Sequence, residues 1–165
     1  MNNNVNFRSF KEGDYETCVK WWKWWWKRTG MPPAKRCFLP SDKRCFVIEK
    51  NGIPVACYFL YLAKDPFIVG YTTYLVSNPK YKEKDRKDLI KLLINKVTEE
   101  AEKIGLFALW TVSGDKFLST IHKDLNWMMI HEDHLFIKFL SKNFTGSNKI
   151  SIKDLIRLQN EGNIE

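Results

Sequence analysis

Apolar residues recur with two different periodicities along this chain. In several short stretches they alternate with polar residues or run together, as in β-strands, and the expected strands are 5–10, 45–49, 53–61, 67–76, 106–112, 127–130 and 134–140. Elsewhere they return every three or four positions, as on one face of a helix, and the expected helices are 14–27 and 89–104, with a shorter one over 116–125. This order predicts one α/β domain over residues 1–141, with 142–165 outside it.

Turn residues indicate how these segments connect. Asn51-Gly52 between two apolar runs is typical of a tight hairpin, so the strands over 45–49 and 53–61 are expected to pair antiparallel. The helix over 89–104 is expected to bury one stripe, formed by Leu89, Leu92, Leu93, Val97, Ala101 and Ile104.

A strand, a polar loop and a helix follow one another between residues 74 and 97. The apolar run ends at Asn78-Pro79, a turn signal that bars the strand from continuing. The polar stretch 80–88 then leads into the helix. The first N–H groups of a helix have no partner inside it and point outward, which suits a phosphate group. This stretch is therefore the first candidate for a binding site.

The helix over 14–27 contains five tryptophans within the six residues 21–26. Five indoles in succession cannot all face one side of a helix, so some must meet a second surface. One interpretation is a helix wedged between the core and a neighbouring loop. Another is a binding surface, with Trp22, Trp25 and Trp26 as walls of a pocket for an acceptor molecule, or with the helix contacting a protein partner.

Composition narrows the class of protein. A hydrophobic fraction of 44% and an aromatic fraction of 15% in 165 residues predict an ordered core. No apolar run is long enough to span a membrane, and the N-terminus lacks the form of a signal peptide, which predicts a cytoplasmic protein. The four cysteines lack metal-ligand spacing and are expected to be reduced, with no metal site.

A formal net charge of +8 favours an anionic ligand or partner. A phosphorylated cofactor, nucleic acid and an acidic protein surface all fit this charge, and no nucleic-acid-binding motif accompanies it.

The last residues differ in pattern from the rest. Residues 142–148 have the composition of a linker. Apolar positions then recur at helical spacing over 150–158, which predicts a small appended helix that docks on the domain or on a protein partner; they are Ile152, Leu155, Ile156 and Leu158.

The order of elements over residues 5–140 resembles the GNAT (GCN5-related N-acetyltransferase) superfamily, and residues 76–88 are similar to small bacteriophage-encoded GNAT-like proteins. This resemblance implies a mixed, mostly antiparallel central sheet with helices on both faces. It also implies an acetyl-CoA-dependent N-acyltransferase, in which an amine attacks the thioester directly. Acetyl-CoA would be the co-substrate.

The resemblance also assigns cofactor-binding residues. The backbone of Tyr74, Leu75 and Val76 would bind the pantetheine arm. The superfamily's pyrophosphate loop, (Gln/Arg)-x-x-Gly-x-(Gly/Ala), falls on residues 82–87, where Asp85 and Lys87 replace the two small residues. The phosphates would then bind side chains of the charged run 82–88, and the predicted residues are Lys82, Lys84, Asp85, Arg86, Lys87 and Asp88. The same run also fits a solvated charged segment in which Asp85 caps the helix.

Catalytic residues follow from the same comparison. His122 lies where the superfamily often has a tyrosine that acts as general acid toward the leaving thiolate. Asp115 lies where an asparagine is common, and the resemblance assigns it to cofactor binding; its simpler role is to cap the next helix. The central strand lacks the glutamate often used as a base, so Thr73 is expected to hold a water there.

Two further functions stay open beside the enzyme. One is a catalytically degenerate GNAT fold that acts as a binding or structural protein, phage-encoded and present in the host cytoplasm or the virion. The other is nucleic-acid binding. For the enzyme, cations in the loop 31–44 favour an acidic or phosphate-bearing amine acceptor; they are Lys35, Arg36, Lys43 and Arg44.

Overall fold

A seven-stranded sheet forms the centre of the protein, in the order β1-β2-β3-β4-β5-β7-β6. The computed structural model describes residues 4–62, 69–131 and 135–140. Its strands are β1 (Val5–Ser9), β2 (Cys45–Lys50), β3 (Ile53–Leu62), β4 (Val69–Ser77), β5 (Ala108–Val112), β6 (Met128–His131) and β7 (Leu135–Phe139). Its helices are α1 (Asp14–Thr29), α2 (Arg86–Lys103) and α3 (Lys116–Asp124), with short 3-10 turns η1 (Arg36–Phe38) and η2 (Asp42–Arg44).

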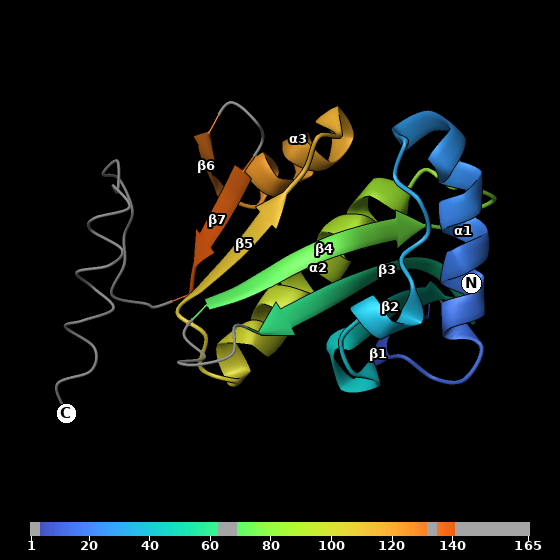
Figure 1. Cartoon of the computed structure of the whole chain (residues 1–165), viewed down its shortest axis with the longest axis horizontal. Coiled ribbons are helices and arrows are strands. Elements are labelled where there is room, and N and C mark those ends of the chain that lie inside the picture. The colour runs from blue at the N-terminus through green and yellow to red at the C-terminus, as the bar shows by residue number, and fades with distance from the viewer. Residues whose placement is uncertain (1–3, 63–68, 132–134, 141–165) are drawn as a thin grey trace, which may run out of the picture.

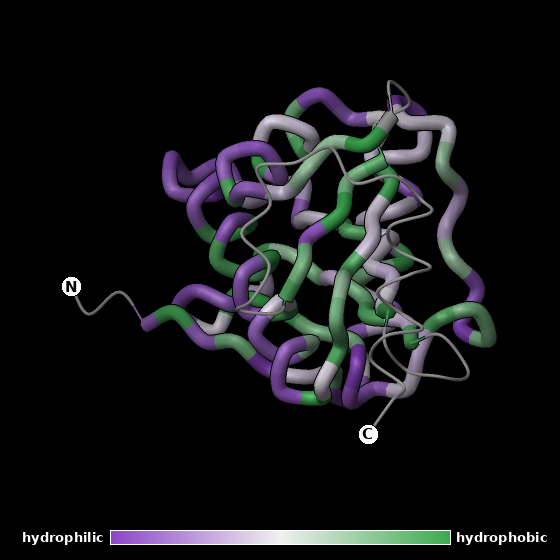
Figure 2. Tube along the Cα trace, turned by 90° about the vertical axis from the view of Figure 1, so that its left-hand side faces the viewer, coloured by the Kyte–Doolittle hydropathy of each residue, from purple (hydrophilic) through white to green (hydrophobic). Residues whose placement is uncertain are grey.

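All neighbouring strands of the sheet are antiparallel except β4 and β5, which are parallel. This confirms the expected mixed, mostly antiparallel sheet. α2 passes behind β3 and β4, whereas α1 packs on the opposite face (Figure 1). The strands at the centre are mostly hydrophobic, and polar stretches lie toward the periphery (Figure 2). The predicted linker and appended helix over 142–165 lie outside the described residues.

α2 buries most of the expected stripe, since Leu89, Leu93, Val97 and Ala101 all lie in the core, but two of its expected members are exposed. Leu92 is 36% exposed and Ile104 is 51% exposed, so neither belongs to the core. Ile90 and Ile94 are buried in their place, beside Leu89, Leu93 and the later core positions of the helix. The buried face of α2 is thus shifted slightly from the expected stripe, toward Ile90 and Ile94.

An ion cluster joins β1, β2 and α1. The Arg8 guanidinium contacts Asp14 and Glu49, with nitrogen–oxygen distances of 2.5 Å in each case, and both carboxylates are buried. The hydrogen bond from Arg8 holds the pKa of Glu49 below its ordinary value. Because unpaired buried charges are costly, this cluster ties the start of α1 to the edge of the sheet.

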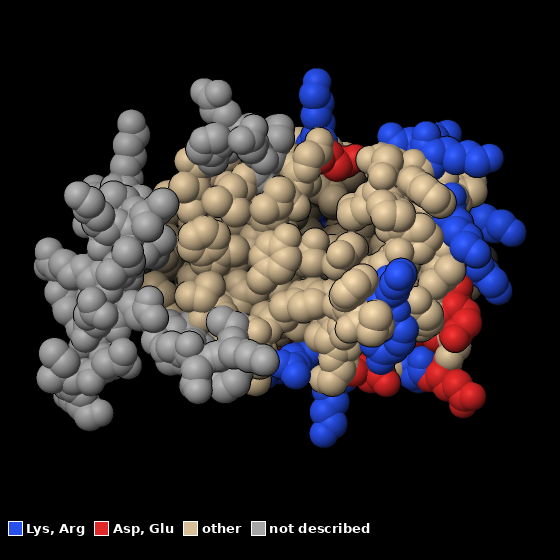
Figure 3. All heavy atoms as spheres, in the orientation of Figure 1, with Lys and Arg blue, Asp and Glu red and all other residues tan. Residues whose placement is uncertain are grey.

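Lys and Arg side chains gather on the side of the molecule where α1 lies, while the middle of the same face carries few charges (Figure 3). Among the described helices, none is both long and apolar enough to cross a bilayer.

Gly70 marks a close approach between β4 and the residues packed behind it. A Cβ at this position would lie 2.6 Å from Leu106 Cδ1 and 2.8 Å from Leu109 Cδ2. We expect Gly70→Ala to lower the free energy of unfolding by about 1–3 kcal/mol, because leucine side chains would be forced off their rotamers. Urea denaturation measures this. Gly114→Ala is the control, since its Cβ would meet nothing within 4 Å. Equal stability of the two variants would contradict the prediction.

Candidate active site

β4 and β5 separate part of the way along their length. Their parallel pairing runs from Val69↔Ala108 to Thr72↔Thr111, and no pair follows among the described residues. The two strands diverge beyond this point, β4 toward α1 and β5 toward α3 (Figure 1). Residues 73–77 of β4 therefore present one backbone edge to the gap without a strand partner on that side.

A bulge shapes the same part of β4. The register with β3 shifts between Phe59↔Thr73 and Cys57↔Val76, so that β4 has one more residue than β3 in this interval. Tyr74 takes up the extra length with a φ of 57°, which is unusual for a residue other than glycine. Its ring contacts Trp22 edge to face, at 6.3 Å between ring centroids. The bulge thus fixes the direction of Tyr74 and Leu75 where the strands part.

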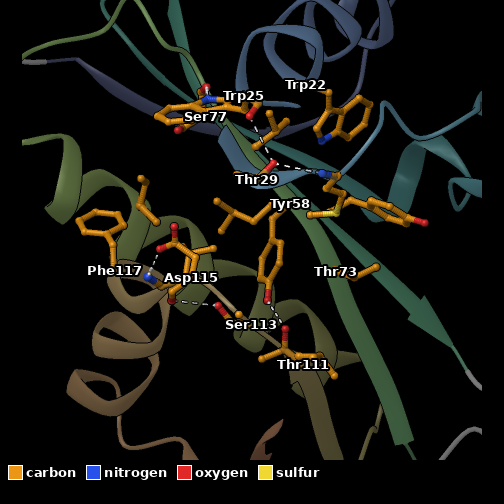
Figure 4. Close-up of a pocket in the computed structure, with 18 of the residues that line it drawn as sticks. Trp22, Trp25, Thr29, Tyr58, Thr73, Ser77, Thr111, Ser113, Asp115 and Phe117 are labelled. Atoms are coloured by element: carbon orange, nitrogen blue, oxygen red, sulfur yellow. Dashed lines mark hydrogen bonds between the residues drawn. The ribbon is translucent and has the colours of Figure 1, made fainter. Parts of the chain in front are cut away.

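A cavity of about 460 Å³ fills the gap between the two strands (Figure 4). It is bordered by α1 on one side, by α3 on the other and by the start of α2. Its lining residues are Trp22, Trp25, Arg28, Thr29 and Met31 from α1 and after it; Tyr58 from β3; residues 73–77 of β4; Arg86 and Ile90 of α2; residues 111–115; and Phe117, Leu118 and His122 of α3.

Tyr58 stands at the point where the strands part. Its side chain is 1% exposed, and its hydroxyl donates to Thr72 Oγ1 at 2.7 Å and lies 3.3 Å from Thr111 Oγ1. These two threonines are the last pair of the β4–β5 ladder. Burial raises the pKa of Tyr58 to about 12, so the phenol keeps its proton at neutral pH.

Tyr58 was missed by sequence reasoning. It lies in a continuous apolar run, where a tyrosine is unremarkable. The available signal was the alternation of β3: Tyr58 is on the face opposite Cys57 and Phe59 and carries the polar group there.

Arg86, a predicted cofactor-binding residue, is the first residue of α2 and lines the cavity. Its Nη2 donates to Ser77 Oγ at 2.5 Å, and its guanidinium lies 5.4 Å from the centroid of a Trp25 ring. It has no ion pair among the described residues, and its buried Nε has no hydrogen-bond partner. Burial lowers the pKa of this guanidinium, which nevertheless stays charged. A cation with an unused donor therefore faces the cavity.

Asp85 occupies the N-cap position of α2, as predicted, but its side chain makes no capping hydrogen bond. Instead it pairs with Lys50 Nζ at 2.5 Å and accepts from the Tyr81 hydroxyl at 2.9 Å. The hydrogen bond from Lys50 lowers the pKa of Asp85. Its negative charge is thus compensated by Lys50 and does not line the cavity.

The other predicted phosphate-binding side chains do not line the cavity in the structure. Lys87 lies 3.3 Å from Asp124 of α3, and Lys82 lies 5.7 Å from the centroid of a Trp24 ring. Lys84 and Asp88 are exposed. Of the charged run 82–88, Arg86 is the residue that lines the cavity.

The tryptophans of α1 separate into different environments. Trp22 and Trp25 line the cavity, as the acceptor-pocket prediction requires, but Trp26 is 50% exposed and is absent from its lining. Trp25 Nε1 donates to the carbonyl oxygen of Ser77 at 2.8 Å, so this indole ties α1 to the end of β4. Arg28, another residue that sequence reasoning missed, lies 4.7 Å from the centroid of a Trp24 ring at the cavity wall.

His122 and Asp115 come from opposite ends of α3. His122 is 1% exposed, and its Nδ1 lies 2.8 Å from the carbonyl oxygen of Leu118. A carbonyl only accepts, so Nδ1 carries the proton and Nε2 is left with a lone pair, without a partner among the described residues. Burial lowers the pKa of His122, which favours this neutral form. Asp115 caps α3 by accepting from Leu118 N at 3.0 Å.

The predicted residues therefore come together in part. One cavity is lined by many of the predicted residues, namely Thr73, Tyr74, Leu75, Val76, Arg86, Asp115, His122, Trp22 and Trp25. The neutral tautomer of His122 suits a proton acceptor rather than the predicted donor. No three His, Cys, Asp or Glu side chains in the described part of the chain are grouped as a metal ion would require.

His122 should make stability depend on pH. Its folded-state pKa lies below the ordinary value of 6.5, so the unfolded chain binds a proton that the folded chain does not as the pH falls through that value. The free energy of unfolding is therefore expected to decrease on acidification from pH 7 toward pH 5. Urea unfolding at several pH values measures this. His122→Gln should reduce the dependence, and an unchanged dependence would exclude His122 as its source.

Acetyltransferases are found among solved structures with a similar fold. N-acetylglutamate synthase from Neisseria gonorrhoeae, solved with coenzyme A and N-acetyl-glutamate, has a TM-score of 0.65 at 15% identity and is matched over 86% of this chain and 36% of its own. An acetyltransferase of the GNAT family from Staphylococcus aureus Mu50 has a TM-score of 0.63 at 12% identity, over 84% and 100%. The ribosomal-protein-S18-alanine N-acetyltransferase from Escherichia coli has a TM-score of 0.63 at 15% identity, over 90% and 100%.

The fold is that of the GNAT acetyltransferases. The chain spans only 36% of the length of the gonococcal enzyme. No family model matches the sequence, and neither does any curated protein. The narrower resemblance to bacteriophage proteins stays a prediction.

Proposed function

We propose that this protein is an acetyl-CoA-dependent N-acyltransferase in which the amine of the acceptor attacks the thioester directly. The observation that carries the proposal is the unpaired edge of β4 over residues 73–77, which faces a cavity between two parallel strands. Extended amides can pair with such an edge as an added strand does. The pantetheine arm has amides of this kind, and the similar gonococcal structure was solved with coenzyme A.

The charged groups of coenzyme A find a complement at the start of α2. Arg86 has a buried Nε without a partner and no carboxylate to neutralise it in the described structure. The N-terminal end of α2 adds unpaired N–H groups and a partial positive charge. Arg86 would hold the pyrophosphate by its side chain. This arrangement differs from a glycine-rich loop, in which backbone amides approach the phosphates.

His122 would serve as the base for the attacking amine. The nitrogen lone pair adds to the carbonyl carbon and forms the C–N bond, and the surplus proton passes from nitrogen to His122 Nε2. The C–S bond then breaks with its electron pair on sulfur, leaving the amide and the thiolate of coenzyme A. The imidazolium returns its proton to solvent. Thr73 and Ser113 line the cavity near this step and would hold water.

The acceptor would be an amine that also carries a carboxylate or phosphate. Arg28 lines the cavity on the α1 side, beside Trp22 and Trp25. The one carboxylate among the described lining residues, Asp115, is engaged in capping α3. An anionic group on the acceptor would therefore meet a cation rather than a like charge. The alternative of a non-catalytic binding module gains no specific support from this cavity.

Acetyl-CoA binding tests the role of Arg86. Calorimetric titration of the wild type is expected to show binding, and Arg86→Gln should weaken it by about 10- to 100-fold, since hydrogen bonds to charged groups contribute about 1.5–3 kcal/mol. Lys103→Gln is the matched control, because it removes one positive charge from the opposite end of the same helix. No binding by the wild type at millimolar acetyl-CoA would refute the proposed function.

The pH dependence of acetyl transfer tests the role of His122. A base acts when it is unprotonated. The lowered pKa of His122 should therefore keep kcat/KM high until the pH falls below 6.5. Release of coenzyme A with hydroxylamine as trial acceptor measures this. His122→Gln should lower kcat by about 100-fold or more while leaving the affinity for acetyl-CoA unchanged. A variant with the wild-type rate and pH profile would remove His122 from the mechanism.

A further inference from the structure

We propose that Tyr58 donates a hydrogen bond to the sulfur of coenzyme A and stabilises the leaving thiolate. This inference rests on the proposed function and adds a catalytic residue on β3, an element that contributes no other side chain to the lining of the cavity. Figure 4 shows the phenol of Tyr58 reaching toward Thr111, between the strands that carry Thr73 and Ser113.

The position of Tyr58 follows from the strand pairing. A ligand that pairs with residues 73–77 of β4 can extend no further than the point where β4 and β5 close again, at Thr72↔Thr111. The Tyr58 hydroxyl lies at this closed end, because it contacts both threonines. The thioester is at the reactive end of the pantetheine arm. Its sulfur would therefore arrive at the phenol.

The hydrogen-bond network allows the phenol to change partner. The Tyr58 hydroxyl donates to Thr72 Oγ1. The Thr72 hydroxyl in turn donates to the carbonyl oxygen of Trp110 at 3.3 Å. Rotation about the C–O bond of Tyr58 would turn the proton away from Thr72 without moving a heavy atom. The Thr111 hydroxyl, 3.3 Å away, can then donate to the phenol oxygen. Thr111 would thus polarise the phenol as charge develops on sulfur.

The proton remains on oxygen during the step. The pKa of Tyr58 is about 12 and lies well above that of an ordinary thiol, so complete transfer to the thiolate is unfavourable. When the C–S bond breaks, its electron pair stays on sulfur as a thiolate that accepts the hydrogen bond from Tyr58. The thiolate takes a proton from water after release.

Coenzyme A and desulfo-coenzyme A separate this role from a structural one without requiring the natural acceptor. Calorimetry at alkaline pH, where the ionised fraction of the thiol is raised, is expected to show that the wild type binds coenzyme A about tenfold or more tightly than the desulfo compound. Tyr58→Phe should abolish this preference while keeping the affinity for desulfo-coenzyme A, which also shows that the variant is folded. Its kcat with hydroxylamine should fall with little change in KM for acetyl-CoA.

Tyr61→Phe is the matched control. It makes the same change on the opposite face of β3, where the Tyr61 hydroxyl bonds to the carbonyl oxygen of Phe38 at 2.9 Å, and it should retain the preference. A wild type without the preference, or a Tyr58→Phe variant that keeps it, would overturn the inference. Failure of the wild type to bind either compound would instead refute the proposed function, and with it this role of Tyr58.

Discussion

The parting of β4 from β5 after Thr72↔Thr111 is the constraint on which the rest of the site depends. Backbone groups require hydrogen-bond partners, so a strand edge that faces an interior gap is stable only if solvent or a ligand satisfies it. Tyr58 bonds to the last threonine pair and fills the closed end, while Tyr74 forms the bulge of β4 beyond it. The β4–β5 pairing, the Tyr58 phenol and the bulge at Tyr74 together set the depth of the cleft.

Ion pairs occupy some of the charged residues at the start of α2 and leave others available to bind a ligand. Asp85 is held by Lys50, and Lys87 is held by Asp124, so these charges join the loop to β2 and α3. Arg86 is left with a hydroxyl and an indole as its neighbours. A run of seven charged residues therefore places one arginine in the cleft, which is consistent with binding by a side chain rather than by a glycine-rich backbone.

The fold was largely predictable because its signals are local. Asn51-Gly52 specifies a hairpin, Asn78-Pro79 ends a strand, and the β–α order determines the arrangement of the sheet. The site was predictable only where position along the chain decides, as for residues 74–76 and His122. The neutral tautomer of His122 depends on a carbonyl one turn earlier in α3, and the importance of Tyr58 depends on threonines from two other strands. Pairing across such distances leaves no trace in spacing or periodicity.

The contact between Trp25 and Arg86 has an optical consequence. Trp25 donates to Ser77 and stacks near Arg86, so its indole senses the charge and the solvent at the start of α2. A ligand that binds Arg86 should alter the surroundings of the Trp25 indole, because the Arg86 guanidinium lies against this ring. Indole emission depends on local polarity. One of the seven tryptophans of the chain thus lies at the candidate phosphate site, and occupancy of that site should change the contribution of this indole to the emission.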